Sequence, residues 1–281
     1  AVLRERVIAD FCREYLLGRT PNPCVRCNQF IKFDALLQKA FVCDADYLAT
    51  GHYARLINTG KGIQLVKGRD PLKDQSYFLY RLSQKQLRHV LFPIGGYTKD
   101  QVRGLARQFG LPVAHKNDSQ EVCFLPDNDY RSFLKRFSRK AIKPGPVVDG
   151  QGRLIGQHRG IPFYTVGQRQ GLGIAAAEPL YITQVDVRHN RITVGSRAQA
   201  FHRALLVSQT HFVLSPLKKR VVLNVRIRYN HKEARARILP FGRKFKVQFF
   251  EPQFAIAPGQ SAVFFKKDRV LGGGIIEKVL G

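Results

Sequence analysis

The sequence lacks any long apolar segment. Nowhere in its 281 residues does an uninterrupted apolar run reach about 18, the length that a membrane-spanning helix requires. Residues 1–6 also lack the apolar core and the small-residue cleavage site of a signal peptide. These absences predict a soluble, cytosolic protein that has no membrane partner and whose cysteines stay reduced.

Methionine and tryptophan are absent altogether. The first residue is Ala1, and residues 2–16 already repeat apolar positions at helical spacing, until Gly18 and Pro21 end the pattern. Because the sequence opens inside a helical pattern, we expect that it is a fragment whose beginning is absent.

Acidic residues are scarce. Asp and Glu number 20 against 47 Lys and Arg, which gives a formal net charge of +27. The excess grows along the chain, and residues 203–281 contain 16 basic and only 4 acidic residues. Because each cation placed on a phosphate releases condensed counterions, such a field favours nucleic acid as the partner. The alternative is a solvated basic surface without a dedicated ligand.

The first part of the chain has the pattern of an α/β domain. A helix is predicted from about residue 28 to 43, and residues 47–50 form a short buried strand that opens into Gly51. Open α/β sheets bind ligands at such strand ends. Residues 98–109 form the clearest helix, because Thr98 and Gln101 make a capping box in front of one apolar face.

Short strands dominate the rest of the chain. From about residue 132 they are separated by turn residues, and from about residue 204 the pattern predicts an antiparallel barrel. Residues 223–229 alternate, so Arg226 and Arg228 share a face that could meet a phosphate backbone or simply face water. We predict an α/β plus β protein with an N-terminal domain over 1–131, a β-rich central domain over 132–203 and a C-terminal barrel over 204–281.

Three cysteines stand in distinctive settings. Cys24 and Cys27 form a Cys-x-x-Cys pair after two prolines, and Cys123 follows far downstream. A structural zinc site would need a second pair, and none is visible in the sequence. The residues alone leave four options open: zinc, a purely structural role, a persulfide relay between Cys27 and Cys123, or an iron–sulfur cluster on all three.

The chain resembles the tRNA-specific 2-thiouridylases (tRNA uridine 2-sulfurtransferases) over nearly its whole length. The resemblance rests on nine short blocks in one order: 18–23 (GRTPNP), 27–28 (CN), 32–33 (KF), 49–55 (ATGHYAR), 74–79 (DQSYFL), 118–121 (DSQE), 123–124 (CF), 165–169 (TVGQR) and 255–263 (AIAPGQSAV). It implies a transferase that uses ATP with Mg to adenylate the C2 oxygen of the wobble uridine, after which sulfur displaces AMP. The N-terminal domain would then be a partial Rossmann-like ATP-pyrophosphatase domain.

The resemblance also implies roles for individual residues. Cys27 matches the nucleophile and Cys123 the persulfide carrier, and a disulfide between them could form after transfer. Gly51 matches a position that contacts ATP. The positions that match tRNA contacts are Asn22, Pro23, Cys24, His52, Lys73, Asp74, Gln75, Arg228, Tyr229 and Gln260. Without the resemblance, His52 would be read as a turn cap, Asp74 as a partner of Lys73 and Gln260 as a hairpin brace. The implied partners are tRNA and a sulfur-donor protein or hydrosulfide.

Two departures from the family pattern keep alternatives open. The Ser-Gly-Gly-x-Asp-Ser phosphate loop is absent from these residues, so the chain alone should bind ATP poorly. Position 24 is Cys where many relatives have Asp, so Cys24, Cys27 and Cys123 could instead hold a [4Fe–4S] cluster whose open iron binds hydrosulfide. Two other readings stay open: a non-catalytic RNA-binding protein with a metal on these thiols, and a ligase of the ATP-pyrophosphatase group.

Overall fold

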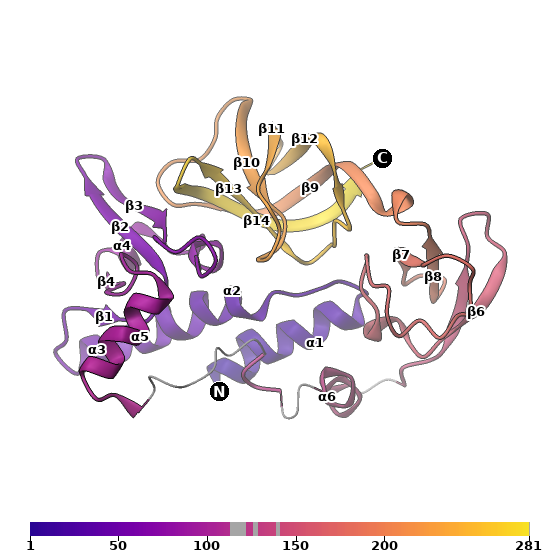
Figure 1. The fold of residues 1–281 in the computed structure, drawn as a ribbon, viewed down its shortest axis with the longest axis horizontal. Helices are drawn as coiled ribbons and strands as arrows, with labels where there is room; N and C mark the ends of the chain where they lie inside the picture. The colour runs from indigo at the N-terminus through magenta and orange to yellow at the C-terminus, as the bar shows by residue number, and fades with distance from the viewer. Residues whose placement is uncertain (113–121, 126–128, 139–140, 281) are drawn as a thin grey trace.

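The computed structural model describes residues 1–112, 122–125, 129–138 and 141–280. A layer of helices lies beneath a β-barrel, and a second, smaller sheet lies at one end of the molecule (Figure 1). The predicted sequence of an α/β region, a small β-rich region and a C-terminal antiparallel barrel is confirmed. No described helix combines the length and the apolar character needed to cross a membrane.

Two long helices run side by side under the barrel (Figure 1). The first consists of η1 (Arg4–Ile8) and α1 (Ala9–Leu16), and it ends where Gly18 takes a φ of +65°. The second runs unbroken through α2 (Pro23–Cys27), η2 (Asn28–Ala35) and α3 (Leu36–Val42). It begins five residues before the predicted start at 28, because Asn22 caps it and Pro23 suits the first helical position. Both cysteines of the pair are therefore helical.

The remaining N-terminal elements are short. Strand β1 (Leu48–Ala49) pairs in parallel with β4 (Val90–Leu91), so the predicted strand exists, but it is shorter than 47–50 and none of these residues is buried. Helix α5 (Lys99–Gln108) has the predicted capping box. None of its residues is fully buried, and Val102, Leu105 and Ala106 on its apolar face are half-buried. The other short helices are η3 (Ser76–Leu79), α4 (Gln84–Leu87) and α6 (Tyr130–Phe137).

A hairpin that the sequence did not predict joins the first part to the barrel. Strands β2 (Ala54–Thr59) and β3 (Gly62–Lys67) pair with each other, and β3 continues the barrel sheet by pairing with β14 (Arg269–Leu280). One apolar core then runs from α2 to the barrel through Val25, Phe33, Tyr77, Val263 and Phe265. The domain boundaries predicted at 131 and 203 stay a prediction, since this sheet spans both of them.

The small sheet has the order β6-β5-β8-β7. Its strands are β5 (Gly145–Val148), β6 (Leu154–His158), β7 (Tyr181–Asp186) and β8 (Arg191–Gly195), preceded or followed by the turns η6 (Ile161–Phe163) and η7 (Ala198–Ala200). Its core includes Phe11 and Cys12 from α1 and Leu134 from α6. The first long helix therefore anchors the small sheet.

Six antiparallel strands close the barrel. They are β9 (Phe201–Phe212), β10 (Val221–Arg226), β11 (Ala234–Phe241), β12 (Lys244–Phe254), β13 (Ser261–Lys266) and β14. The β13–β14 pairing completes the closure. Leu223, Val225 and Ile227 are buried, as their alternation predicted, although β10 ends at Arg226.

Candidate functional site at the start of the central helix

A turn of the barrel holds the segment that precedes the cysteine pair. The Gln260 side-chain amide donates to the carbonyl oxygens of Thr20 (3.1 Å) and Pro21 (3.0 Å), and the Thr20 N–H donates to the Pro258 carbonyl at 2.8 Å. Gly259 has a φ of +94°, and a Cβ there would lie 2.8 Å from the Thr20 carbonyl oxygen. Gln260 is therefore a brace, but between two distant segments and not within a hairpin.

The first turn of α2 is held from two more directions. The Asn22 side chain accepts a hydrogen bond from the Val25 N–H at 3.3 Å. Arg26 Nε lies 3.0 Å from Asp10 Oδ2 on α1, and Arg26 Nη2 donates to Gln209 Oε1 at 3.3 Å. Capping and these cross-links fix the direction of the helix, so they also fix where Pro23 and the following thiol are presented.

The three thiols affect one another. Cys24 and Cys123 are exposed, and Cys27 is half-buried. Desolvation by the surrounding protein raises the pKa of Cys24, and the charges of Cys27 and Cys123 raise it further. Desolvation also raises the pKa of Cys27, and Cys123 again adds to the increase. Although Cys123 is distant in the sequence, its thiol shares one electrostatic environment with the other two, and Cys24 and Cys27 favour the protonated form.

Lys32 opposes these increases, and sequence reasoning missed it as a site residue. Its ammonium lowers the pKa of both Cys24 and Cys27. The Leu36 N–H bonds to the Ile31 carbonyl, the i→i−5 pattern of a π-helical turn. This wider winding brings residues five apart, such as Cys27 and Lys32, toward the same face. The Lys-Phe block at 32–33 was visible in the sequence, but only the helix winding connects it to the thiols.

Replacing Lys32 by methionine is expected to slow alkylation of Cys27. Loss of the ammonium raises the pKa of the Cys27 thiol further and lowers its thiolate fraction, and a change of one pKa unit is about a tenfold change in thiolate below the pKa. We expect iodoacetamide labelling of Cys27 at pH 8, measured by peptide mass spectrometry, to slow on the order of several-fold. Lys39→Met, at an exposed position of α3, is the matched control, and equal labelling of both variants would contradict the role of Lys32.

His52 is a buried, neutral ring beside the same lysine. Its pKa is lowered to about 3, first by burial and then by the charge of Lys32. Its Nδ1 lies 2.9 Å from Thr50 Oγ1, and its ring packs 5.6 Å from Phe33 and 5.8 Å from Phe92. The proposed turn cap is thus partly right, because the ring does bond within its own turn. Its neutrality excludes His52 as a charged contact to phosphate near neutral pH.

His52 is expected to make the free energy of unfolding decrease as the pH is lowered. Its folded pKa of about 3 lies below the ordinary value of 6.5, so the unfolded chain takes up a proton in that window and the folded one does not. Stability is therefore lost as pH falls below 6.5, by about 1.4 kcal/mol between pH 7.5 and 5.5. The free energy of unfolding is measured with urea at both pH values. In His52→Gln it should decrease by about 1.4 kcal/mol less than in the parent protein, because the other histidines are present in both proteins. If His52→Gln loses as much stability between pH 7.5 and 5.5 as the parent protein does, the lowered pKa of His52 is contradicted.

Gly51 leads into a tightly held turn. It is exposed, and a Cβ there would meet only Ile94 at 3.8 Å, so the strand end is open for a ligand. The Tyr53 N–H donates to Gln75 Oε1 at 3.0 Å, and the Gln75 N–H donates back to the Tyr53 carbonyl at 2.9 Å. Gln75 therefore fixes the turn that carries Gly51.

Asp74 lies in a buried ionic network. Its Oδ1 accepts from the N–H groups of Gly68 and Ser76, both at 3.1 Å, and its Oδ2 lies 3.3 Å from Arg226 Nη1. The Lys73 N–H donates to the Asp70 carbonyl at 3.2 Å. The sequence offered Lys73 as the ionic partner of Asp74; the structure gives it Arg226, which belongs to a strand of the barrel.

The sequence left open whether Arg226 and Arg228 meet a phosphate backbone or face water, and the structure gives both of them partners within the protein. Arg226 lies 3.0 Å from Glu233 as well as near Asp74, and Arg228 donates to the carbonyls of Phe254 and Ala255. Tyr229 is half-buried against Phe78, with the ring centroids 4.5 Å apart. Alternation predicted one face for both arginines, but Arg228 lies in a bend beyond the end of β10, and the pattern contains no information on the acceptors of either side chain.

Within the described part of the chain, no group of three or more His, Cys, Asp or Glu side chains has the arrangement of a metal site. Cys24, Cys27 and Cys123 share an electrostatic environment without converging as ligands, so they do not fit a preformed cluster site. The fourth and fifth cysteines lie apart: Cys12 is buried, with its pKa raised to about 12 by desolvation, and Cys43 is exposed.

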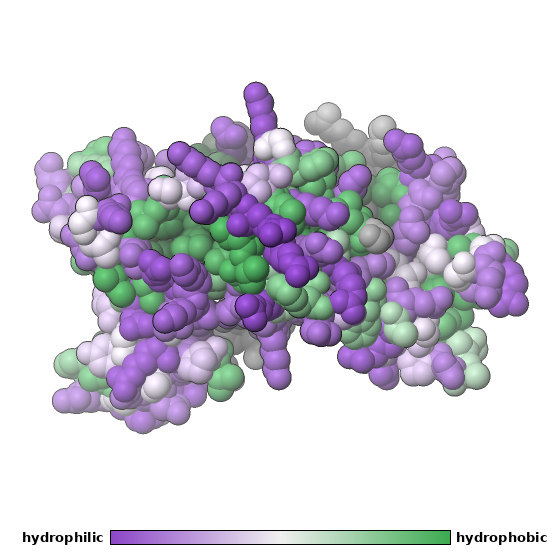
Figure 2. All heavy atoms as spheres, turned by 90° about the horizontal axis from the view of Figure 1, so that it is seen from above, coloured by the Kyte–Doolittle hydropathy of each residue, from purple (hydrophilic) through white to green (hydrophobic). Residues whose placement is uncertain are grey.

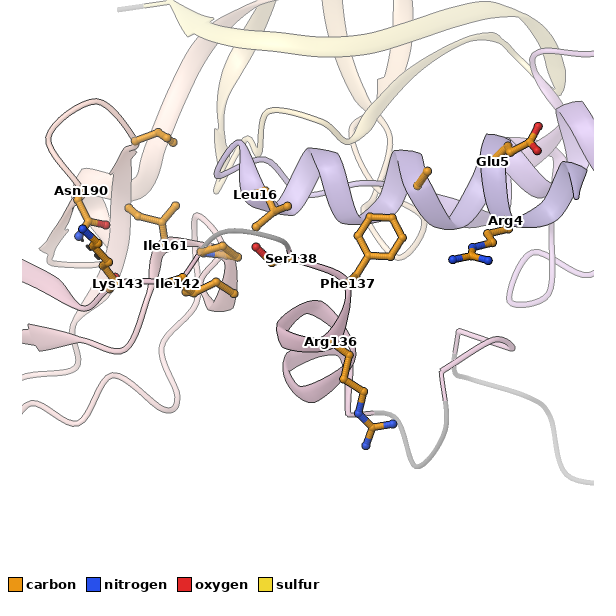
Figure 3. Close-up of a pocket in the computed structure, with 14 residues that line it drawn as sticks. Arg4, Glu5, Leu16, Arg136, Phe137, Ser138, Ile142, Lys143, Ile161 and Asn190 are labelled. Carbon is orange, nitrogen blue, oxygen red and sulfur yellow. Dashed lines mark hydrogen bonds between the residues drawn. The ribbon is translucent and has the colours of Figure 1, made fainter.

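A cavity of about 1200 Å³ opens elsewhere, between α1, α6 and the small sheet. It is lined by Arg4, Glu5, Ala9, Leu16, Arg136, Phe137, Ser138, Ala141, Ile142, Lys143, Ile161, Pro162, Val187 and Asn190. Figure 3 shows Leu16, Ile142 and Ile161 grouped at one end, while Arg136 points away. The cavity contains none of the predicted site residues and no thiol. The DSQE block at 118–121 lies outside the described residues.

Three family models match the chain. The model described as tRNA methyl transferase HUP domain matches residues 2–127, the tRNA methyl transferase PRC-barrel domain matches 131–196, and the aminomethyltransferase beta-barrel domain matches 202–276. These three ranges correspond to the helical part, the small sheet and the closed barrel.

Curated relatives match nearly the whole chain. The tRNA-specific 2-thiouridylase MnmA 1 of Caldanaerobacter subterraneus subsp. tengcongensis is 50% identical over 281 residues, which is 99% of this chain and 77% of the relative. The tRNA-specific 2-thiouridylase MnmA of Carboxydothermus hydrogenoformans is 49% identical, over 99% of this chain and 78% of the relative. That of Clostridium acetobutylicum is 45% identical, over 98% and 78%.

Proposed function

Because the chain belongs to the tRNA-specific 2-thiouridylase family, we propose that it is a tRNA uridine 2-sulfurtransferase acting on the wobble uridine of tRNA anticodons. The match to 2-thiouridylases over 99% of this chain carries the proposal, and the exposed Cys123 and half-buried Cys27 support it, because the charge of Cys123 raises the pKa of Cys27. Two thiols near one exposed surface are what a sulfur relay requires.

ATP supplies the activation in this proposal. The C2 oxygen of the uridine attacks the α-phosphorus of ATP, delivered as its magnesium complex, and pyrophosphate leaves. A carbonyl oxygen is a poor leaving group, whereas the adenylated oxygen departs as AMP. Gly51 is the proposed ATP contact, supported by its exposed position at the end of β1 and by the room that its missing side chain leaves.

Sulfur transfer then follows through two cysteines. The terminal sulfur of a Cys123 persulfide attacks C2, AMP leaves, and the uridine is bound to Cys123 through a disulfide. The Cys27 thiolate attacks the Cys123 sulfur, which releases 2-thiouridine and forms a Cys27–Cys123 disulfide. Two routes reload Cys123. A thiol reductant can supply two electrons to open the disulfide, after which a sulfur-donor protein passes the outer sulfur of its own persulfide to the Cys123 thiol and is left with a free thiol. Alternatively, hydrosulfide attacks the Cys123 sulfur of the disulfide, which forms the Cys123 persulfide directly and releases the Cys27 thiolate.

The charges around Cys27 suit a thiol that stays protonated in the free protein and becomes a thiolate when it reacts. Desolvation raises its pKa, which keeps it protonated in the free protein, while Lys32 favours the thiolate once Cys27 must attack. The neutral His52 next to Lys32 adds no competing charge. The proposal therefore assigns Lys32 a positioning and electrostatic role beside the two catalytic cysteines.

The basic surface supports RNA as the substrate. Seen from above, hydrophilic side chains form a band across the face that carries the barrel (Figure 2). Arg235 and Arg237 on β11 are exposed and lie over the Phe250 ring, at 5.5 and 4.6 Å from its centroid. The predicted tRNA contacts at Asn22, Pro23, Cys24, Gln260 and 73–75 stay proposals. The hydrogen bonds of Gln260 to Thr20 and Pro21, and of Asn22 to Val25, support a role for these side chains in holding the loop that meets the base.

The test is direct. The protein as the cell produces it is incubated with ATP, unmodified tRNA and a radioactive sulfur source, and the tRNA nucleosides are separated. We expect labelled 2-thiouridine that depends on ATP, with one AMP released per sulfur transferred. Tight tRNA binding without any transfer would overturn the proposal and support a non-catalytic RNA-binding protein.

A further inference from the structure

A second cavity, of about 570 Å³, lies where the small sheet meets the barrel. It is lined by Gln168, Arg169, Gln170, Tyr181, Arg197 and Phe254. These residues come from the TVGQR loop, from β7, from the turn before η7 and from the last position of β12. The Phe254 carbonyl accepts a hydrogen bond from Arg228, but the other five residues do not belong to the site described above, and the TVGQR block has no role in the proposed reaction.

Aromatic rings form the floor of this cavity. Tyr181 meets Phe254 edge-on at 5.6 Å, and Phe201 packs against the same ring at 5.3 Å. The Arg197 guanidinium lies over both phenylalanines, 5.2 Å from the Phe254 centroid and 5.3 Å from that of Phe201. Arg197 is nevertheless exposed, so its guanidinium group is held against the rings and still reaches solvent.

The rim is cationic and built on a shaped loop. Arg169 is exposed, while the Gln168 amide bonds back to the Gln170 carbonyl at 2.8 Å and accepts from the Thr165 N–H at 3.1 Å. At Gly167 φ is +87°, and a Cβ there would lie 2.2 Å from the Ala255 Cβ, so this loop packs directly on the barrel. No carboxylate lines the cavity among the described residues, so both guanidinium groups lack a local acidic partner there.

The cavity is linked to the helix start by short contacts. Thr165 Oγ1 lies 3.3 Å from Thr20 Oγ1, the residue that the barrel turn holds. Arg228 donates to the Phe254 and Ala255 carbonyls, which fixes the other wall. An RNA engaged at the start of α2 would therefore pass close to this cavity.

We propose that this cavity holds an unstacked nucleotide of the RNA that flanks the target base. Stacking on aromatic and guanidinium planes, combined with arginine contacts to phosphate, is how proteins hold unpaired RNA nucleotides. The inference rests on the proposed function for the identity of the RNA. Arg197 supplies the stacking plane, and Arg169 supplies the phosphate contact.

Three substitutions test the site: one that keeps the positive charge, and two that each remove one positive charge at different places. The dissociation constant of unmodified tRNA is measured at several salt concentrations for Arg197→Lys, Arg169→Ala and the control Arg243→Ala. Arg243 is exposed in the turn between β11 and β12, and Phe254 ends β12 on the order of 30 Å away at strand spacing. We expect about tenfold weaker binding for Arg197→Lys, since a stacked plane is lost while the charge stays. Arg169→Ala should lower the salt slope by about one.

The outcomes separate this inference from the proposed function. Equal small losses in all three variants would overturn the cavity as a nucleotide site and leave the thiolation proposal intact. If tRNA binding depends on Arg197 but the protein transfers no sulfur, the cavity is supported as a nucleotide site and the thiolation proposal is overturned. Photocrosslinking of tRNA carrying 5-bromouridine should label the peptide with Tyr181, and capture of an acidic peptide without RNA competition would count against the proposal. Arg169→Ala tests the same cavity through a side chain that contacts no ring among the described residues, so the inference stays testable even if the Arg197 variant misfolds.

Discussion

Replacing Cys123 by serine is expected to abolish sulfur transfer to tRNA while leaving tRNA affinity unchanged. A hydroxyl cannot carry a persulfide, so the loss of thiolation rate should be at least about 10³-fold, as for other removed covalent nucleophiles. Cys123 is exposed, so the serine should cost little stability. The measurement pairs radioactive sulfur incorporation with filter binding of the same tRNA.

Cys27→Ser should fail at a different step. The persulfide on Cys123 can still attack the activated base, but no thiolate then releases it, so a tRNA linked to the protein through a reducible disulfide should accumulate. Cys43→Ser is the control, because Cys43 is exposed and follows the far end of the same helix. Undiminished thiolation by Cys123→Ser would contradict the relay.

The elements that the sequence predicted correctly are those with a local cause. The capping box of Thr98 and Gln101, the glycine that ends the first helix and the alternation of Leu223, Val225 and Ile227 each act over a few residues. Helix and strand identity follow from such short patterns. The closed barrel then follows from several alternating segments in succession.

The features that the sequence did not predict depend on contacts between distant segments. Nothing in residues 54–67 alone indicates that β3 extends the barrel by pairing with β14, because the register is set in the folded sheet. The brace from Gln260 to Thr20 is equally non-local. Lys32 was overlooked because ordinary helical spacing does not bring it toward Cys27, whereas π winding does.

The candidate site was predicted through family resemblance more than through chemistry. Residue type alone could not tell whether Asp74 meets RNA or protein. The structure gives its carboxylate two backbone N–H donors, the Ser76 hydroxyl at 3.1 Å and the Arg226 guanidinium. A carboxylate repels a phosphate of like charge, and these four contacts give Asp74 a structural role.

Asp74→Ala is accordingly expected to lower the free energy of unfolding by about 3–5 kcal/mol. The Asp74 side chain is 2% exposed and that of Arg226 13%, so its removal leaves a nearly buried guanidinium with one anionic partner fewer and two backbone N–H groups without an acceptor. Urea unfolding measures the change. Asp100→Ala, at an exposed position in the first turn of α5, should cost at most about 1 kcal/mol.

Asp74→Asn separates the structural role from an RNA contact. The amide keeps an oxygen for the Gly68 and Ser76 N–H groups but loses the ionic attraction to Arg226, so this variant should fold with a smaller loss of stability. Its tRNA affinity, corrected for any unfolded fraction, should stay within about threefold of the parent, below the tenfold change that 1.4 kcal/mol represents. A well-folded Asp74→Asn protein that has lost tRNA affinity would show that the carboxylate itself reads the RNA, and the buried network would then be only its support.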